Sequence, residues 1–214
     1  MRFFSLGIQG NVSIFASGIN RQVMIFEKIF ENTKPFAGCL LVSEPFMIDP
    51  NFRRTVILIT EHNDKGTVGF VVNKELTVFP HKAISSFPEF GRKLLLGGPV
   101  QRDNLFFIHT IGKKIEGASK VAPGLWWGGD YDQIKELVKS GKANEDNVRF
   151  IVGYSGWEPG QLDQELSTNS WIITKASKEY VFGSEPEALW KKVLRDMGKD
   201  FAVVADLPED PTLN

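Results

Sequence analysis

The sequence predicts an α+β protein with a compact, strand-rich and largely antiparallel core and helices packed around it. Short apolar runs bounded by turn residues cluster before about residue 110, and such runs are typical of strands. Helical spacing of apolar residues mixes with further strands only after that point. A regular α/β fold would alternate strands and helices along the whole chain, so this segregated order favours the α+β class.

The first three predicted strands are residues 38–43, 55–60 and 67–73. Residues 55–60 read TVILIT, a nearly continuous apolar run that is typical of a strand covered on both faces. Residues 61–66 are polar and rich in turn formers, so the second and third strands are expected to form an antiparallel hairpin. We predict five further strands, at residues 93–96, 104–110, 149–154, 171–174 and 179–182.

Three helices are expected in the second half of the chain. Asp130 is a favourable N-terminal cap for the first of them. A short helix is expected at about residues 161–168. Ser184 and Glu187 have the spacing of a capping box, which begins the last helix, and Gly198 ends it.

The chain is divided into three parts on this basis. Residues 1–35 form an N-terminal extension that we expect to be partly disordered, with a short helix capped by Asn20. Residues 36–200 form one domain, as a total length of 214 residues favours. Residues 201–214 are predicted to be a loose acidic tail.

No segment of the sequence predicts export or contact with a membrane. Gly7, Gln9 and Gly10 interrupt any apolar run that could serve a signal peptide, and no stretch nears the roughly 18 apolar residues of a membrane helix. The single cysteine, Cys39, lies in a predicted strand, where it is expected to be a buried filler. One cysteine allows no internal disulfide, which fits the reducing cytoplasm that we predict as the location.

The charge balance argues against direct binding to nucleic acid. The chain has 25 basic and 26 acidic residues, so no field of the whole molecule attracts a polyanion. The basic residues of the last predicted helix, Lys191, Lys192 and Arg195, have acidic residues close by, and no helix-turn-helix is visible. Direct DNA binding is therefore the weakest of the functions considered below.

Residues 153–171 are the most informative segment of the chain, with the sequence GYSGWEPGQLDQELSTNSW. Ser155 resembles the serine of a nucleophile turn, but Trp157 stands where that turn needs its second glycine, so a structural turn is favoured. Gln161, Glu165 and Asn169 recur every four residues and would form one polar stripe on a helix. This stripe could line a cleft or face solvent.

His62 is the second candidate for chemistry, with Glu61 and Asn63 beside it. In a strand these two neighbours point to one side and His62 to the other, so His62 needs a partner from elsewhere. His109 is the natural candidate, and with Glu165 the pair could bind a metal or exchange protons.

Structural histidines, held by hydrogen bonds, are the favoured interpretation. The sequence lacks closely spaced ligands such as His-x-x-x-His and has no pair of thiolates. Gly97-Gly98-Pro99 lacks the continuation of a phosphate-binding loop. We therefore predict no catalytic residue, no metal and no cofactor. The side chains that could line a ligand-binding cleft are Glu61, His62, Asn63, His109, Gln161, Glu165 and Asn169.

Several motifs of this chain resemble those of the YqgE/AlgH family of bacterial proteins. They are residues 38–45 (GCLLVSEP), 61–63 (EHN), 97–100 (GGPV) and the 153–171 segment, and the likeness covers about residues 36–200. The resemblance implies one compact α+β domain. It implies no activity, because the family has no agreed catalytic residues, although some members are labelled transcriptional regulators.

We predict a non-enzymatic binding or regulatory protein that acts through contact with a protein or a small ligand. The absence of an intact catalytic constellation motivates this prediction. An enzyme with a cleft site of Glu61, His62, His109 and Glu165 is the first alternative. A DNA-binding transcriptional regulator is the second.

Overall fold

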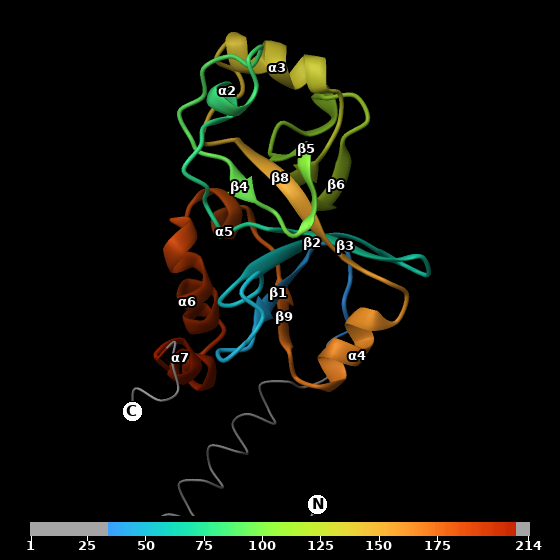
Figure 1. Ribbon diagram of the computed structural model, residues 1–214, viewed down its shortest axis with the longest axis vertical. Helices are drawn as coiled ribbons and strands as arrows, with labels where there is room; N and C mark the ends of the chain where they lie inside the picture. The colour runs from blue at the N-terminus through green and yellow to red at the C-terminus, as the bar shows by residue number, and fades with distance from the viewer. Residues whose placement is uncertain (1–33, 209–214) are drawn as a thin grey trace, which may run out of the picture.

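The computed structural model describes residues 34–208, so the predicted helix at Asn20 lies outside the described residues. Within residues 34–208 the chain forms a curled, mainly antiparallel sheet in the order β6-β7-β5-β8-β3-β2-β1-β9, with β4 paired to β8 beside this path (Figure 1). Helices pack around it, so the predicted α+β class is confirmed. The strands are β1 (Cys39–Ser43), β2 (Val56–Asn63), β3 (Gly66–Val71), β4 (Leu95–Leu96), β5 (Val100–His109), β6 (Ser119–Ala122), β7 (Leu125–Trp127), β8 (Val148–Trp157) and β9 (Trp171–Lys175).

The helices are short and most follow β8 in sequence. A 3₁₀ turn, η1 (Gly112–Lys114), lies between β5 and β6. None of the helices in this part of the chain combines the length and apolarity that crossing a bilayer requires. The α-helices are α2 (Pro80–Ala83), α3 (Tyr131–Lys139), α4 (Gln161–Ser167), α5 (Lys178–Phe182), α6 (Pro186–Asp196) and α7 (Lys199–Ala205).

Strands β1 and β2 are buried on both faces, as the run at residues 55–60 predicts. Leu40 lies opposite Leu58, and both belong to the apolar cluster that α6 covers with Trp190. Leu41 lies opposite Ile57, and both face the second cluster, which α4 covers with Leu162. Alternate residues therefore enter different cores, and this two-sided burial requires apolar residues at every position.

A third apolar cluster fills the other half of the molecule, where α2 and α3 lie beyond β5 and β8 (Figure 1). Phe150 of β8 is at its centre, with the rings of Phe87 and Phe90 packed edge-on at centroid distances of 4.9 Å each. Helix α3 begins as predicted, since the Asp130 carboxylate accepts a hydrogen bond from Gln133 N–H at 2.8 Å. β8 contributes to both halves and joins them.

Two predictions near the C-terminus are wrong. Residues 179–182 belong to helix α5 and not to a strand, because the Ser177 hydroxyl caps the segment by accepting from Tyr180 N–H at 3.3 Å. The capping box of Ser184 and Glu187 does not form. The Ser184 hydroxyl donates to the Glu179 carbonyl at 3.3 Å, and α6 begins after Glu185 with Pro186 in its first turn.

A helix also replaces the first part of the predicted loose tail. α7 buries Val204 and Ala205 in the cluster that contains Trp190. This apolar contact outweighs the acidic composition of the segment, which is the signal that predicts a tail. The hairpin of β6 and β7 is a further element that the sequence did not predict, since its strands have only four and three residues. The division of the chain into three parts stays a prediction.

Glycines allow the chain to pass from one edge of β8 to the other. β4 pairs with residues 151 and 152 of β8, and β5 pairs with the same residues from the opposite edge. The link between them, residues 97–99, crosses β8 at Gly153. A Cβ atom on Gly98 would lie 2.3 Å from the Tyr154 carbonyl oxygen, and one on Gly153 would lie 2.7 Å from the Gly98 oxygen. Two backbones touch here, so a side chain has no room.

Substituting Gly153 with alanine tests this crossing. Gly153 and Gly124 have nearly the same backbone angle, φ of +71° and +74°, but an added Cβ at Gly124 meets no atom within 4 Å. Gly124→Ala should cost about 1 kcal/mol of unfolding free energy from the left-handed conformation alone. Gly153→Ala should cost about 2 kcal/mol more, because fixed backbone atoms cannot yield. Urea denaturation measures both values, and equal losses would show that the crossing has room to relax.

Candidate functional site

The Glu165 carboxylate joins polar and aromatic residues of the 153–171 segment into one network. Its Oε2 atom accepts hydrogen bonds from the indole N–H of Trp157 at 2.9 Å and of Trp171 at 2.7 Å. Its Oε1 atom accepts from Gln161 Nε2 at 3.0 Å. The two indole rings meet edge-on at a centroid distance of 6.1 Å. Buried indole N–H groups need an acceptor, and one carboxylate supplies it for both.

Gln161 carries this network to the end of β8. Its side-chain oxygen accepts a hydrogen bond from Glu158 N–H at 3.0 Å, while its amide nitrogen donates to Glu165. Helix α4 begins after Gly160, which offers no side-chain cap. The Gln161 side chain therefore fixes the turn between β8 and α4, and both of its polar atoms are engaged.

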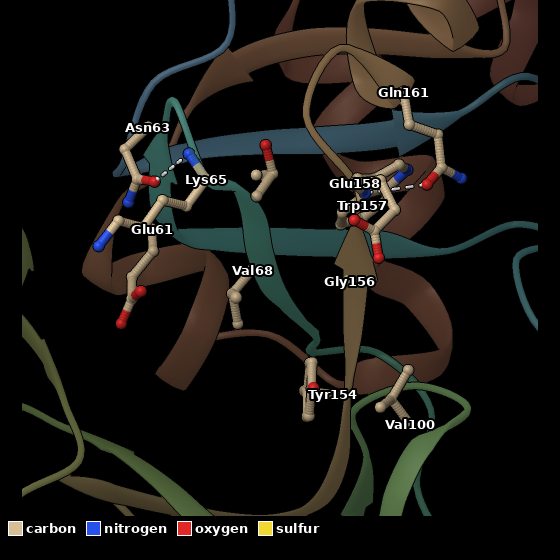
Figure 2. Close-up of a pocket in the computed structure, with 12 residues that line it drawn as sticks. Glu61, Asn63, Lys65, Val68, Val100, Tyr154, Gly156, Trp157, Glu158 and Gln161 are labelled. Atoms are coloured by element: carbon tan, nitrogen blue, oxygen red, sulfur yellow. Dashed lines mark hydrogen bonds between the residues drawn. The ribbon is translucent and has the colours of Figure 1, made fainter.

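A surface pocket of about 460 Å³ lies between the hairpin of β2 and β3 and the end of β8 (Figure 2). We call it the hairpin pocket. Figure 2 shows residues of the hairpin on one side and the β8–α4 turn on the other. The pocket contains three of the seven side chains that the sequence singles out: Glu61, Asn63 and Gln161. The other residues that line it are Lys65, Gly66, Thr67, Val68, Val100, Tyr154, Gly156, Trp157 and Glu158.

Two carboxylates in the hairpin pocket have no partner among residues 34–208. The side chains of Glu61 and Glu158 are exposed and take part in no hydrogen bond or ion pair within that range. The Lys65 ammonium group also lacks one there, and two negative charges stand against this one positive charge. The Asn63 side chain is engaged, since its oxygen accepts from Lys65 N–H at 2.8 Å.

His62 points away from its two neighbours, as the strand geometry predicts. Its Nδ1 atom lies 2.7 Å from the Thr67 hydroxyl, directly across the hairpin. This contact fixes the register of the hairpin, and His62 is not among the residues that line the pocket. Asn169 also lies outside the pocket. Asn169 follows the C-cap of α4 and has a left-handed backbone conformation, with φ of +59°.

His109 lies far from the hairpin pocket. It stands opposite Val148 on β8, whereas the first pocket residue of that strand is Tyr154. Six residues of strand separate these positions by roughly 20 Å. The structure therefore does not bring His109 together with Glu61, and the four residues of the enzyme alternative do not form one cleft.

The His109 side chain is fully buried, and neither ring nitrogen has a hydrogen-bond partner within residues 34–208. Burial lowers the pKa of His109 from 6.5 to about 4. The backbone of Gly128 is close enough to oppose this shift in part, although its geometry makes no hydrogen bond. Trp126 lies opposite His109 in the sheet. His109 is thus a neutral core residue at physiological pH.

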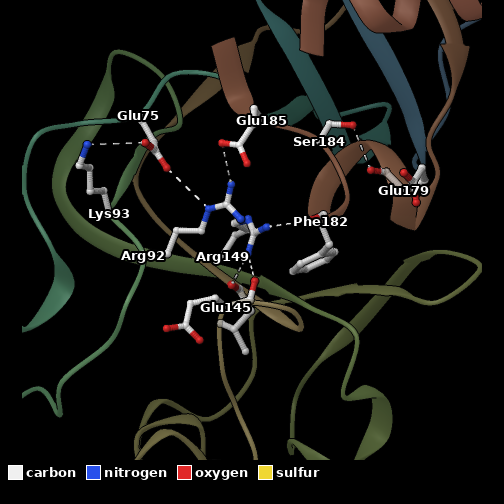
Figure 3. A network of polar contacts seen from close by, with 10 residues as sticks. Glu75, Arg92, Lys93, Glu145, Arg149, Glu179, Phe182, Ser184 and Glu185 are labelled. Carbon is white, nitrogen blue, oxygen red and sulfur yellow. Dashed lines mark hydrogen bonds and ion pairs between the residues drawn. The ribbon is translucent and has the colours of Figure 1, made fainter. Parts of the chain in front are cut away.

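A second polar cluster surrounds Arg149, near the start of β8 (Figure 3). The buried guanidinium donates to the carbonyls of Val148 and Phe182 at 3.1 Å each, and to that of Glu145. Burial, and then the nearby charge of Arg92, lower the pKa of Arg149 to about 10. Arg92 in turn pairs with Glu75 and Glu185 at 3.6 Å each.

This Arg149 cluster links the start of β8 to the turn between α5 and α6. The Arg149 guanidinium donates its hydrogen bonds to main-chain carbonyls. These bonds therefore hold backbone segments together. The cluster is therefore a structural joint between the two halves of the molecule.

Sequence reasoning missed Lys65, Tyr154 and Glu158 as pocket residues. Lys65 is in the hairpin turn, and the 153–171 segment contains the other two. Their closeness in sequence to the predicted cleft residues was the signal that could have identified them. Val68 and Val100 had no signal, because valine in a strand usually belongs to the core. Both are only partly buried, and the tertiary structure brings them to one pocket.

The comparisons with known proteins agree with one another. The model of the AlgH-like family matches residues 40–202. A UPF0301 protein from Chlorobaculum parvum is 44% identical over 178 residues, which is 83% of this chain and 95% of that protein. One from Bacteroides thetaiotaomicron is 36% identical over 191 residues, covering 89% and 97%.

Solved structures show the same fold. The AlgH protein of Pseudomonas aeruginosa has a TM-score of 0.66 and 26% identity, and the match covers 83% of this chain and 98% of that one. A protein from Corynebacterium diphtheriae has a TM-score of 0.70 and 25% identity, covering 86% and 97%.

Removing the Glu165 carboxylate should destabilise the protein. Glu165→Ala leaves two largely buried indole N–H groups without an acceptor, so we expect a loss of about 3 kcal/mol in unfolding free energy. Glu165→Gln keeps one acceptor oxygen and should lose less. Gln164→Ala is the matched control, an exposed position on the same helix without a side-chain hydrogen bond. Urea denaturation followed by tryptophan fluorescence measures all three, and a loss for Glu165→Ala no larger than that of the control contradicts the role of the network.

His109 should make stability depend on pH between about 6.5 and 4. Its pKa is lower in the folded state than in the unfolded state, so unfolding takes up a proton in this range and stability falls as pH falls. Between pH 7 and pH 5 the loss from this group should be about 2 kcal/mol. His109→Gln should remove that part of the loss. Urea denaturation of both proteins at the two pH values gives the comparison, and identical losses would exclude His109 as the source.

Proposed function

We propose, for a chain that belongs to the AlgH-like family, a non-enzymatic binding function centred on the hairpin pocket. The ligand carries a positively charged group next to an apolar group. It is presented by a partner protein or by a small molecule, and its binding serves a regulatory purpose. The observation that supports this proposal most is a pair of carboxylates, Glu61 and Glu158, on the two sides of one pocket, neither of which has a partner within residues 34–208.

Charge favours a cationic ligand. Two carboxylates and one ammonium group line the pocket, which leaves an excess of one negative charge. Charge-assisted hydrogen bonds to carboxylates are about twice as strong as neutral ones. An amine or guanidinium between Glu61 and Glu158 would therefore gain interactions that no side chain within residues 34–208 now supplies to them.

The remaining wall of the pocket favours an apolar group beside that charge. Val68, Val100 and the Tyr154 ring line it and leave part of their surface to solvent. Covering such surface is favourable by roughly 25 cal/mol per Å². The side chains of lysine and arginine combine an aliphatic stem with a cationic head, which fits both parts of the wall.

The position of the sequence-predicted groups supports binding over catalysis. Glu165, one of the four residues of the enzyme alternative, accepts hydrogen bonds from two indoles and one amide. His109 is separated from the pocket by roughly 20 Å along β8. His62 is engaged with Thr67. A general acid or base must reach the substrate, and these residues do not share one space.

We place this function in the cytoplasm, as a part of the proposal. Cys39 is fully buried, and burial raises the pKa of its thiol to about 11, which keeps it protonated and unreactive. A chain with one buried, unreactive cysteine forms no internal disulfide, so it does not need an oxidising compartment.

Neutralising the two carboxylates tests the proposal. The probe is N-acetyl-arginine N-methylamide, a capped arginine, titrated by calorimetry. The double variant Glu61→Gln with Glu158→Gln should weaken binding by about tenfold, and added salt should weaken binding to the unaltered protein. Glu89→Gln with Glu187→Gln removes the same charge at exposed sites outside the pocket and should leave affinity unchanged. Equal effects of the two double variants, or no binding at all, would contradict the proposal.

A further inference from the structure

One edge of β8 is open beside the hairpin pocket. β5 pairs with β8 as far as Tyr154, opposite Val100, and no strand in residues 34–208 takes its place beyond that point. On its other edge β8 continues to pair with β3, through residues 155–157. The crossing of residues 97–99 explains the gap, because the chain reaches this edge only at Val100.

The direction of the backbone groups at this open edge follows from β3. Val71 N–H donates to the Gly97 carbonyl at 2.9 Å, on the side of β3 that faces β8. Neighbouring residues of a strand direct their N–H and C=O groups to opposite edges. Gly69 and Thr67 therefore also face β8, where they lie opposite Ser155 and Trp157.

Gly156 lies between those two residues and directs its N–H and C=O to the open edge. It is exposed, and neither group has a partner elsewhere in the described chain. Strand edges of this kind recognise extended peptides, which add one further strand. One peptide residue opposite Gly156 can form both hydrogen bonds of an antiparallel pair.

The missing side chain of Gly156 leaves space on the face that carries the pocket. Tyr154 and Val68 lie on this face, and an added Cβ on Gly156 would be 3.2 Å from the Tyr154 ring. Residues paired across two strands place their side chains on the same face. The side chain of a peptide residue opposite Gly156 would thus extend over Tyr154 towards the carboxylates of Glu61 and Glu158.

We propose that the ligand of the hairpin pocket is an extended peptide segment of a partner protein, which pairs with Gly156 and places a lysine or arginine side chain in the pocket. This inference rests on the proposed function and adds the class of ligand. The backbone pair supplies orientation, and the carboxylates select the basic side chain. The segment occupies the place that β5 would take if it began before Val100.

A three-probe experiment on the full chain separates the backbone contact from the side-chain contact. The first probe is the peptide acetyl-Thr-Val-Arg-Val-Thr-amide, the second is the same peptide with a methyl group on the backbone nitrogen of its arginine, and the third is the capped arginine. Calorimetry measures each affinity. We expect the first to bind about tenfold more tightly than the second, because the methyl group removes the arginine N–H that donates to the Gly156 carbonyl. The capped arginine keeps that N–H but lacks the flanking residues that extend the strand, so it should also bind more weakly than the first.

A protein variant gives the same test from the other side. Gly156→Pro removes the N–H donor and should reduce affinity for the first probe to that of the second, while circular dichroism checks that the variant is folded. The methylated peptide needs no altered protein, so misfolding of the variant leaves the test intact. Equal affinity for all three probes would overturn the peptide inference and keep the proposed function. No binding of any probe would overturn both.

Discussion

The end of β8 and the start of α4 depend on one carboxylate. Glu165 accepts hydrogen bonds from Trp157 on β8, from Trp171 on β9 and from Gln161 on its own helix. These contacts join two strands that are distant in the sheet order, and they hold the turn that forms one side of the hairpin pocket. A tryptophan brings a large apolar surface into the core but also a polar N–H, so each ring needs an acceptor at a fixed place. A single acidic residue at residue 165 meets both requirements.

The strand crossing at Gly153 depends on the absence of side chains, whereas the Glu165 network depends on side-chain hydrogen bonds. Gly98 and Gly153 let two backbones touch where the chain passes from one edge of β8 to the other. The crossing fixes the point at which β5 begins, and so it determines which part of β8 has no partner on this edge among residues 34–208. The close packing of two backbones at Gly153 and the uncovered edge of β8 at Gly156, as seen within residues 34–208, therefore have the same cause. That cause is the crossing of residues 97–99 over β8. The residues Gly97-Gly98-Pro99 have a conformational role, in agreement with their lack of a phosphate-binding sequel.

Several polar residues that invite a chemical role have a structural one instead. His109 is buried as a neutral ring, His62 fixes the register of a hairpin, and Arg149 fastens the two halves of the molecule through main-chain carbonyls. Each is locally similar to a catalytic residue in its type and its burial. What separates them from a site is distance from one another, which neither composition nor spacing in the sequence contains. At the pocket, the exposed carboxylates of Glu61 and Glu158 have no partner within residues 34–208, and nothing in their type or position in the sequence marks them as a site.

The sequence by itself determined the elements whose signal is local. The run at residues 55–60, the polar turn at 61–66 and the cap at Asp130 predicted two strands, a hairpin and a helix, because each depends on residues close together in the chain. Of the seven residues that the sequence assigned to a cleft, Glu61, Asn63 and Gln161 line the hairpin pocket. Tertiary structure alone decided the helix at residues 199–205, since its stability comes from burying Val204 against a distant cluster. It also decided that His109 lies far from the pocket and that no strand within residues 34–208 covers the edge of β8 at Gly156, because both follow from which strands pair and where they cross. Strand pairing joins segments that are far apart in the sequence, so the partner of each strand is determined only when the whole sheet forms.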